Sequence, residues 1–317
     1  MVIKNLKRKR ILITILVVIL FILLSNMIAT KCIYDSIFPR YDCNAALTQG
    51  LDSTLSLREE KYFPSGEHTL CGYLYTSQVP NAKKGLIVLS SGHNACADSY
   101  LWQIKELMEY GWSVFAFDST GCCNSEGDSA VGFSQELLDL QAALTYIEAE
   151  NRFGFESIAL FGHSRGGYAA CCVLSSDFDI DAVVSVSGVN SPMEAIIGAM
   201  DRYVGKLAYV NYGPLWLYQS ILFGKETVNL KANEVLSQTQ VPVLIVHGAN
   251  DREVPTDAFS IYAYKDSIEK DNVSFLLRSA PESSGHTNLL FDADQTANNE
   301  LIAKISDFLE KTIDKEG

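Results

Sequence analysis

Apolar residues occur in short runs that alternate with amphipathic stretches from about residue 55 to the end of the chain. Short apolar runs bounded by turn residues predict strands, and apolar residues three or four positions apart predict helices. The expected strands are 57–63, 69–76, 85–90, 112–117, 157–161, 182–186, 241–246 and 273–277, and the expected helices are 98–110, 134–150, 165–175, 256–270 and 300–311. Apolar strands separated by helices predict the α/β class, with a mostly parallel eight-stranded sheet flanked by helices.

One long interval breaks this alternation. Residues 189–240 separate two expected strands by far more than an ordinary crossover, and they are rich in aromatic residues. We therefore expect a helical cap inserted at the edge of the sheet, with Trp216, Tyr218 and Phe223 near the mouth of a substrate pocket. The alternative is that these rings pack only against the cap's own core.

The most apolar part of the chain precedes the α/β pattern. Residues 11–29 contain three polar residues, Thr14, Ser25 and Asn26, and a helix of this length roughly matches the hydrocarbon core of a bilayer. The basic cluster at residues 7–10 lies directly before it. Because basic residues favour the cytoplasmic side, we expect a single-pass membrane protein with a cytoplasmic N-terminus and an extracytoplasmic domain.

These features divide the chain into a cytoplasmic basic tail (1–10), a transmembrane signal anchor (11–30), a juxtamembrane linker (31–54) and a globular domain (55–317). A cleaved signal peptide is the alternative to the anchor. Cleavage after Ala29 fits poorly, because Met27 would then occupy a position that requires a small residue.

The formal net charge is −13, and it is unevenly distributed. Residues 1–31 hold six basic and no acidic residues, so the rest of the chain carries 19 basic against 38 acidic residues. An acidic domain repels phosphate backbones, which argues against nucleic acid as a partner. Neither charge nor composition favours or opposes a homodimer.

The clearest chemical signal is the sequence Gly162-His163-Ser164-Arg165-Gly166. It follows an expected strand and precedes an expected helix, which is the context of a nucleophile elbow. The glycines permit a tight turn, and the helix N-terminus behind the serine favours a developing negative charge. We interpret Ser164 as a nucleophile; the alternative is a glycine-rich turn without chemistry.

A serine nucleophile requires a base and an acid that orients the base. Of the five histidines, His286 follows the last expected strand, which gives the chain order nucleophile, acid, base that accompanies this elbow. Asp251 follows the strand 241–246 and is the first candidate for the acid. Glu253 and Asp257 are the alternatives for that role.

These motifs, taken in order, resemble the α/β-hydrolase superfamily, and its serine aminopeptidase-like and monoglyceride-lipase-like branches in particular. The resemblance covers about residues 57–312 and rests on the stretches 86–93, 118–127, 162–166, 251–255 and 285–286. The chain departs from the family pattern at Ser91, which stands where the family has the histidine of a His-Gly pair, and at Thr120 and Cys123 in the next turn. These departures affect loop shape more than the serine, aspartate and histidine.

The resemblance implies an acyl-transfer mechanism. His286 would take the proton of Ser164, and Asp251 would hold His286 in the required tautomer. Neither a metal nor an organic cofactor is expected. The expected oxyanion donors are the backbone N–H groups of Arg165, His93 and Asn94.

The eight cysteines all precede residue 173, and none has the spacing of a zinc site. An extracytoplasmic domain permits disulfides. In the fold that the resemblance implies, loops after neighbouring strands lie together, so we expect Cys96 to pair with Cys122 or Cys123. The alternative is three reduced thiols.

The leading hypothesis is hydrolysis of a small-molecule acyl substrate, a carboxylic ester or lipid, at the extracytoplasmic membrane face. The cap and the anchor both favour an apolar acyl group. A serine peptidase or aminopeptidase of the same fold is the alternative, and an acidic pocket would support it. A non-catalytic surface protein on a hydrolase scaffold is the alternative from another class.

Overall fold

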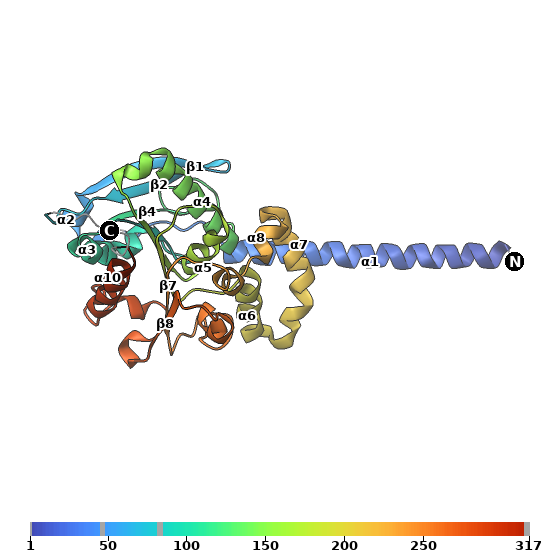
Figure 1. Cartoon of the computed structure of the whole chain (residues 1–317). Coiled ribbons are helices and arrows are strands. Elements are labelled where there is room, and N and C mark those ends of the chain that lie inside the picture. The colour runs from blue at the N-terminus through green and yellow to red at the C-terminus, as the bar shows by residue number, and fades with distance from the viewer. Residues whose placement is uncertain (1, 45–47, 81–84, 314–317) are drawn as a thin grey trace.

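The computed structural model describes residues 2–44, 48–80 and 85–313, which form a globular domain and a long N-terminal helix that leaves it (Figure 1). One sheet of eight strands runs through the domain in the order β1-β2-β4-β3-β5-β6-β7-β8. The strands are β1 (Arg58–Ser65), β2 (His68–Tyr75), β3 (Leu86–Ser90), β4 (Ser113–Phe117), β5 (Ile158–His163), β6 (Ala182–Val186), β7 (Val243–Gly248) and β8 (Val273–Arg278). Strands β1, β2 and β4 pair antiparallel, and all pairs from β4 to β8 are parallel. The predicted fold class is confirmed.

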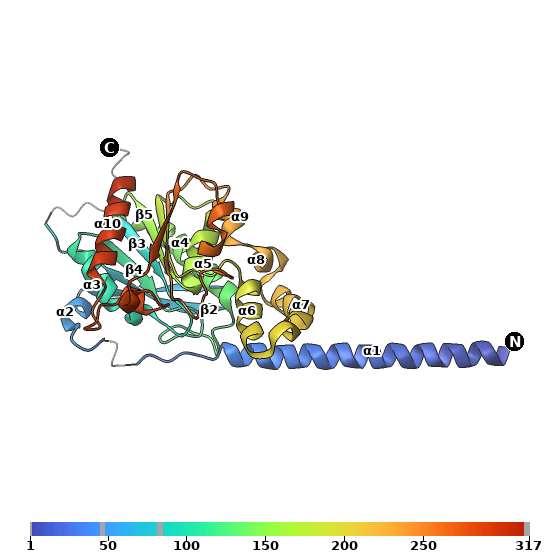
Figure 2. The ribbon, with the colours of Figure 1, turned by 90° about the horizontal axis from the view of Figure 1, so that it is seen from below.

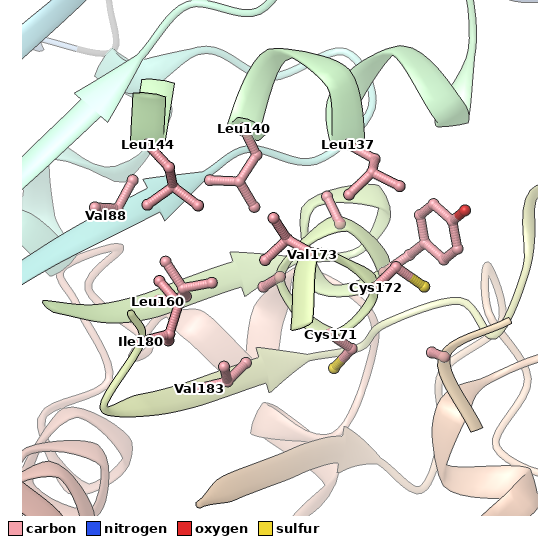
Figure 3. Packing of buried hydrophobic residues seen from close by; sticks show 14 of the residues in the cluster. Val88, Leu137, Leu140, Leu144, Leu160, Cys171, Cys172, Val173, Ile180 and Val183 are labelled. Atoms are coloured by element: carbon pink, nitrogen blue, oxygen red, sulfur yellow. The ribbon is translucent and has the colours of Figure 1, made fainter. Parts of the chain in front are cut away.

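Helices cover both faces of this sheet. The helices on one face are α3 (Leu101–Glu109) and α10 (Asn299–Ile313), and those on the other are α4 (Phe133–Ala149), α5 (Arg165–Cys172) and α9 (Ala232–Leu236). Consecutive strand residues point to opposite faces. Thus Ile87 and Leu89 pack with the first group, whereas Val88 packs with the second. Figure 3 shows the second cluster, in which leucines of α4 lie over Val88 and Leu160.

The insertion between β6 and β7 is helical, as expected. It consists of α6 (Pro192–Val204), the 3₁₀ segment Gly205–Asn211, α7 (Tyr212–Phe223) and α8 (Lys225–Asn229), followed by α9. Ser191 begins α6 as its N-cap, because its Oγ accepts the N–H of Glu194 at 3.2 Å, and Pro192 suits the first helical turn. Figure 2 shows α6 and α7 beside the end of the domain where α1 leaves it.

The N-terminal helix is longer than the anchor expected at 11–30. Helix α1 (Val2–Ile37) continues through the first part of the expected linker, and a short helix, α2 (Asp52–Leu55), ends that linker. Tyr34, in the last turn of α1, and Phe38, the residue after that helix, are buried in a cluster with apolar residues of the cap. Residues 7–37 are long and apolar enough to cross a membrane, with a mean hydropathy of 3.0 in the most apolar window.

One expected helix is wrong. Residues 256–270 contain only the 3₁₀ segment Ile261–Ser267. The hydroxyl of Thr256 donates to the carbonyl of Gly248, and that of Ser260 donates to the carbonyl of Thr256. Side-chain bonds of this kind compete with a regular helix, which the apolar spacing alone does not reveal.

Candidate active site

Ser164 lies on a tight turn between β5 and α5. Its backbone adopts φ 57° and ψ −116°, a strained conformation for a residue with a side chain. Gly162 and Gly166 permit the turn, since a Cβ on either would lie 2.1 Å from a carbonyl oxygen, of Gly166 and Ser90 respectively. The expected strand–serine–helix elbow is therefore present, and it raises the serine hydroxyl above the carboxyl edge of the sheet.

The side chains of Ser164, His286 and Asp251 meet at this edge. His286 Nε2 lies 3.0 Å from Ser164 Oγ, and His286 Nδ1 lies 2.7 Å from Asp251 Oδ2. All three residues are buried. They arrive on the loops after β5, β8 and β7, because parallel strands end at one edge of the sheet. The tautomer that satisfies both bonds has Nδ1–H donating to Asp251 and Nε2 accepting the serine hydroxyl.

Asp251 is held as a carboxylate by its surroundings. Its Oδ1 accepts the backbone N–H groups of Glu253 at 2.9 Å and Val254 at 2.8 Å. Burial would raise the pKa of Asp251, but the hydrogen bond and electrostatic attraction of His286 and the N–H of Val254 hold that pKa below its usual value. The two alternative acids are exposed: Asp257 lies at the surface, and the Glu253 carboxylate is 3.9 Å from His286 Nε2.

His163 connects the loops on either side of the serine. Burial lowers the pKa of His163 to about 3, so its ring is neutral. Tyr100 Oη then donates to Nδ1 at 2.8 Å, and Nε2–H donates to the carbonyl of His286 at 3.2 Å. The N–H of Gly92 donates to Tyr100 Oη at 2.8 Å. One series of hydrogen bonds therefore joins the loop after β3 to the loop that carries His286.

The side chain of Arg165 points away from the reaction centre into a buried polar cluster. Its guanidinium lies 3.0 Å from Glu136 Oε2, and both side chains are buried. The hydroxyls of Ser90 and Ser119 donate to the two oxygens of Glu136 at 2.7 and 2.6 Å. Burial would lower the pKa of Arg165, but Glu136 raises it above its usual value. This cluster holds the first turn of α5 against the end of β3.

Two cavities meet at Ser164 and His286. The more polar one, of about 490 Å³, is lined by the loop after β3, including His93 and Asn94. The more apolar one, of about 470 Å³, lies under α6 and also contacts α1. Its apolar lining includes Ile33, Ile37, Ile196, Met200, Tyr203 and Phe259. A substrate divided into an apolar acyl part and a polar leaving group fits this pair of cavities.

The three expected cap residues do not line either cavity, which corrects the sequence prediction. Trp216 Nε1 donates to Asn229 Oδ1 at 2.8 Å, and Tyr218 Oη donates to Asp35 Oδ1 at 2.8 Å. Phe223 is buried. The reason is the layering of the cap: α6 covers Ser164, whereas α7 packs between α6 and α1.

Sequence reasoning missed the residues that do line the apolar cavity. Ile196, Met200 and Tyr203 repeat at helical spacing along α6, and Ile33 and Ile37 repeat along α1. The first repeat was a usable signal, because it marks the apolar face of a helix that opens the insertion. The second repeat could not be recognised, because it directly follows the apolar run 11–29.

The disulfide prediction was wrong about the partner. Cys123 is bonded to Cys43, with Cα atoms 5.1 Å apart, while Cys96 and Cys122 are free. Residues 39 and 41 form bridges to 129 and 122, which brings the linker against this turn. The sulfur of Cys96 lies 3.8 Å from that of Cys43. Among the described residues these three sulfurs form the one cluster with metal-like spacing, but two of them are joined in the disulfide.

Sequence comparisons give two matches. Residues 81–209 match the family described as serine aminopeptidase, S33. The human protein ABHD12B is 26% identical over 176 residues, a match that covers 53% of this chain. The chain spans about half the length of that curated relative, since the match covers 45% of it.

Solved structures extend the likeness over most of the domain. An esterase of Pyrococcus furiosus, Pf2001, has a TM-score of 0.65 and 18% identity, covering 87% of this chain and 98% of the esterase. Est1E of Butyrivibrio proteoclasticus, solved with ferulic acid, has a TM-score of 0.59 and 19% identity, covering 80% and 100%. The acylaminoacyl peptidase of Pyrococcus horikoshii has a TM-score of 0.57 and 15% identity, covering 80% and 41%. The family match includes the elbow, and these structures share the fold around it, so the chain has the α/β-hydrolase fold and is similar to serine aminopeptidases over residues 81–209.

Proposed function

We propose that the chain is a serine hydrolase that cleaves a carboxylic ester through Ser164, His286 and Asp251. The observation that carries this proposal is the hydrogen-bonded series from Asp251 through His286 to Ser164, which lines an apolar cavity of about 470 Å³. A nucleophile, a base and an orienting acid in this geometry are the requirements for acyl transfer.

The reaction proceeds in two halves. Ser164 Oγ attacks the acyl carbon while His286 Nε2 accepts its proton, and Asp251 stabilises the imidazolium that forms. His286 then protonates the leaving alcohol, which departs and leaves an acyl-enzyme. Water, deprotonated by His286, attacks that ester, and the acid is released as Ser164 regains its proton.

The developing oxyanion requires N–H donors beside Ser164. Arg165 is the first residue of α5, where backbone N–H groups have no acceptor within the helix. His93 and Asn94 line the polar cavity with Ser164, and either can supply the second N–H. Each such donor contributes about 2.7–4 kcal/mol to transition-state stabilisation. Arg165 thus serves through its backbone, while its side chain stabilises the turn.

An ester of an apolar acid is the substrate class that the cavities favour. The apolar cavity accepts the acyl chain, and the polar cavity accepts the alcohol part. The similar solved structure from Pyrococcus furiosus is an esterase by name.

A peptidase is the second candidate, and one observation favours it. The carboxylate of Glu253 is 72% exposed and lines both cavities beside His286. A carboxylate in that place can bind the ammonium group of a substrate N-terminus. The family that matches residues 81–209 is described as a serine aminopeptidase.

We also propose that the domain lies on the extracytoplasmic face, with the helix α1 as a single-pass anchor. The basic residues 7–10 favour a cytoplasmic N-terminus. The bond between Cys43 and Cys123 suits an oxidising compartment. Protease added to intact cells should remove the domain but spare an N-terminal tag; protection of the domain would contradict this orientation.

Labelling with a fluorophosphonate probe tests the chemistry. The full chain should be labelled, and Ser164→Ala should abolish labelling. A series of p-nitrophenyl esters should then be hydrolysed faster than aminoacyl p-nitroanilides. If the anilides are faster and Glu253→Gln removes that preference, the peptidase is correct. Absence of labelling in a folded protein would support the non-catalytic scaffold.

A further inference from the structure

The corner of the cap between α6 and α7, residues 203–212, is unusually apolar for a protein surface. Tyr203 is 89% exposed, Leu207 72% and Val210 73%. The other exposed large apolar residues of this corner are Val204, Tyr209 and Tyr212. We call residues 203–212 the cap corner. A contiguous apolar patch of this kind on an otherwise acidic domain indicates a contact surface.

The position of the cap corner relative to α1 identifies what it contacts. Thr30 Oγ1 donates to Asn211 Oδ1 at 3.1 Å. Thr30 is the first residue after the apolar run 11–29, so Asn211 lies level with the end of the membrane span. Figures 1 and 2 show α6 and α7 next to the point where α1 leaves the domain. The cap corner therefore lies where the bilayer surface must be if α1 spans it.

The composition of the cap corner suits that interface. It holds three tyrosines and no acidic residue, although the chain as a whole has a net charge of −13. Tyrosine rings favour the headgroup layer of a bilayer. The one basic side chain, Lys206, has its ammonium group 5.1 Å from the centre of the Tyr209 ring, and a long basic side chain can extend to a lipid phosphate.

The mouth of the apolar cavity opens on the same side. Ile33 of α1 and Tyr203 of α6 both line the cavity that reaches Ser164, and Ile33 is 49% exposed. Residues that line a cavity and also face outward mark its opening. This opening lies between the membrane helix and the cap corner, so an acyl chain can pass from the bilayer toward Ser164 without crossing water.

We propose that the cap corner inserts into the interface of the membrane that holds α1, and that the gap between Ile33 and Tyr203 admits the acyl chain of an ester lipid from that leaflet. The second half of this proposal rests on the proposed esterase function. It names the source of the substrate: the membrane in which the protein is anchored.

Depth-dependent quenching tests the insertion without relying on activity. The full chain is reconstituted in phosphatidylcholine vesicles whose acyl chains carry bromine, which quenches tryptophan on contact. Leu207→Trp should add fluorescence that is quenched. The matched control Leu57→Trp is also exposed but precedes β1, and its added fluorescence should not be quenched. Equal, low quenching at both positions would overturn the insertion.

Activity tests the path of the acyl chain. The double variant Leu207→Ser/Val210→Ser changes residues outside both cavities, so hydrolysis of a water-soluble short ester should be unchanged. Hydrolysis of a long-chain ester lipid in the same vesicles should fall by about tenfold, since two apolar contacts with the bilayer are lost. Equal rates for the lipid in the variant and the native chain would overturn the lipid path.

The outcomes separate this inference from the proposed function. If Leu207→Trp is quenched but no ester is hydrolysed, the esterase proposal fails and the membrane contact stands. If short esters are hydrolysed but Leu207→Trp is unquenched, the esterase stands and the membrane contact fails. An unquenched tryptophan combined with loss of a dimer in the double variant, measured by light scattering in detergent, would assign the cap corner to a contact between copies instead.

Discussion

The buried ion pair between Glu136 and Arg165 makes a quantitative prediction possible. The two side chains are 3.0 Å apart and buried, and the hydroxyls of Ser90 and Ser119 also donate to Glu136. Glu136→Gln keeps the shape of the side chain but removes its charge. The guanidinium then remains buried without its carboxylate partner. Asp139 also attracts the guanidinium, but its oxygens already accept hydrogen bonds from Ser65 and Thr120.

The expected cost is large compared with the stability of a protein. Removal of one partner from a buried ion pair destabilises a fold by about 3–5 kcal/mol, and total stabilities are about 5–15 kcal/mol. Urea unfolding of the full chain in detergent, followed by tryptophan fluorescence, should show that Glu136→Gln lowers the free energy of unfolding by about 3–5 kcal/mol. Adding Arg165→Met to Glu136→Gln should recover part of the lost free energy of unfolding, because this second substitution removes the unpaired guanidinium charge.

A surface ion pair provides the control. Lys105 and Glu109 are 2.7 Å apart on α3, and both remain accessible to water. Glu109→Gln should change the free energy of unfolding by no more than about 1 kcal/mol, as is usual for exposed pairs. If Glu136→Gln costs no more than this control, the buried pair does not stabilise the elbow, and the reasoning about the cluster is wrong.

Three further predictions concern the acid, the buried histidine and the disulfide. Asp251→Asn should lower kcat on a short ester by about 10⁴-fold while leaving the fold intact, as in other Ser-His-Asp enzymes; a loss below tenfold would remove Asp251 from its role. His163 has a folded-state pKa of about 3, below its unfolded value of 6.5, so its contribution to stability is complete above pH 6.5 and is lost as the pH falls toward 3. His163→Gln should therefore reduce the slope of the unfolding free energy against pH between pH 6.5 and 3, by up to about 1.4 kcal/mol per pH unit. An unchanged slope would contradict the conclusion that burial keeps His163 neutral. Cys43→Ser removes the disulfide between residues 80 positions apart in the sequence. Thermal or urea unfolding should show a decrease of about 2–4 kcal/mol in the free energy of unfolding. A reductant should cause no further decrease in the variant.

Much of the fold and of the candidate site could be predicted because the signals are local. The elbow around Ser164 is a continuous motif between a strand and a helix. Asp251 and His286 follow strands, and parallel strands deliver their loops to one edge. In each case the sequence neighbours of a residue determine where it lies.

The rest depends on contacts between distant segments. Aromatic content marked α7 as the pocket helix, but the packing of α7 against α1 places Trp216 and Tyr218 outside the cavities. Cys43 meets Cys123 because the chain after α1 returns along the turn after β4. Neither arrangement follows from periodicity, since both depend on how the N-terminal helix α1 packs against a domain that follows it in the sequence.

Because α1 continues into the domain as one helix, its rotation about its own axis is fixed relative to the domain. Residues 30–37 are helical, and Thr30 and Tyr34 face the cap from one side of that helix. Each residue of an α-helix advances the side chains by about 100°. Deleting or inserting a single residue after Ala29 would therefore turn the apolar run 11–29 relative to the domain, whereas the same change in a flexible tether would only alter its length. If α1 spans a membrane as proposed, the helix sets both the distance of the domain from the bilayer and the direction in which Ser164 faces.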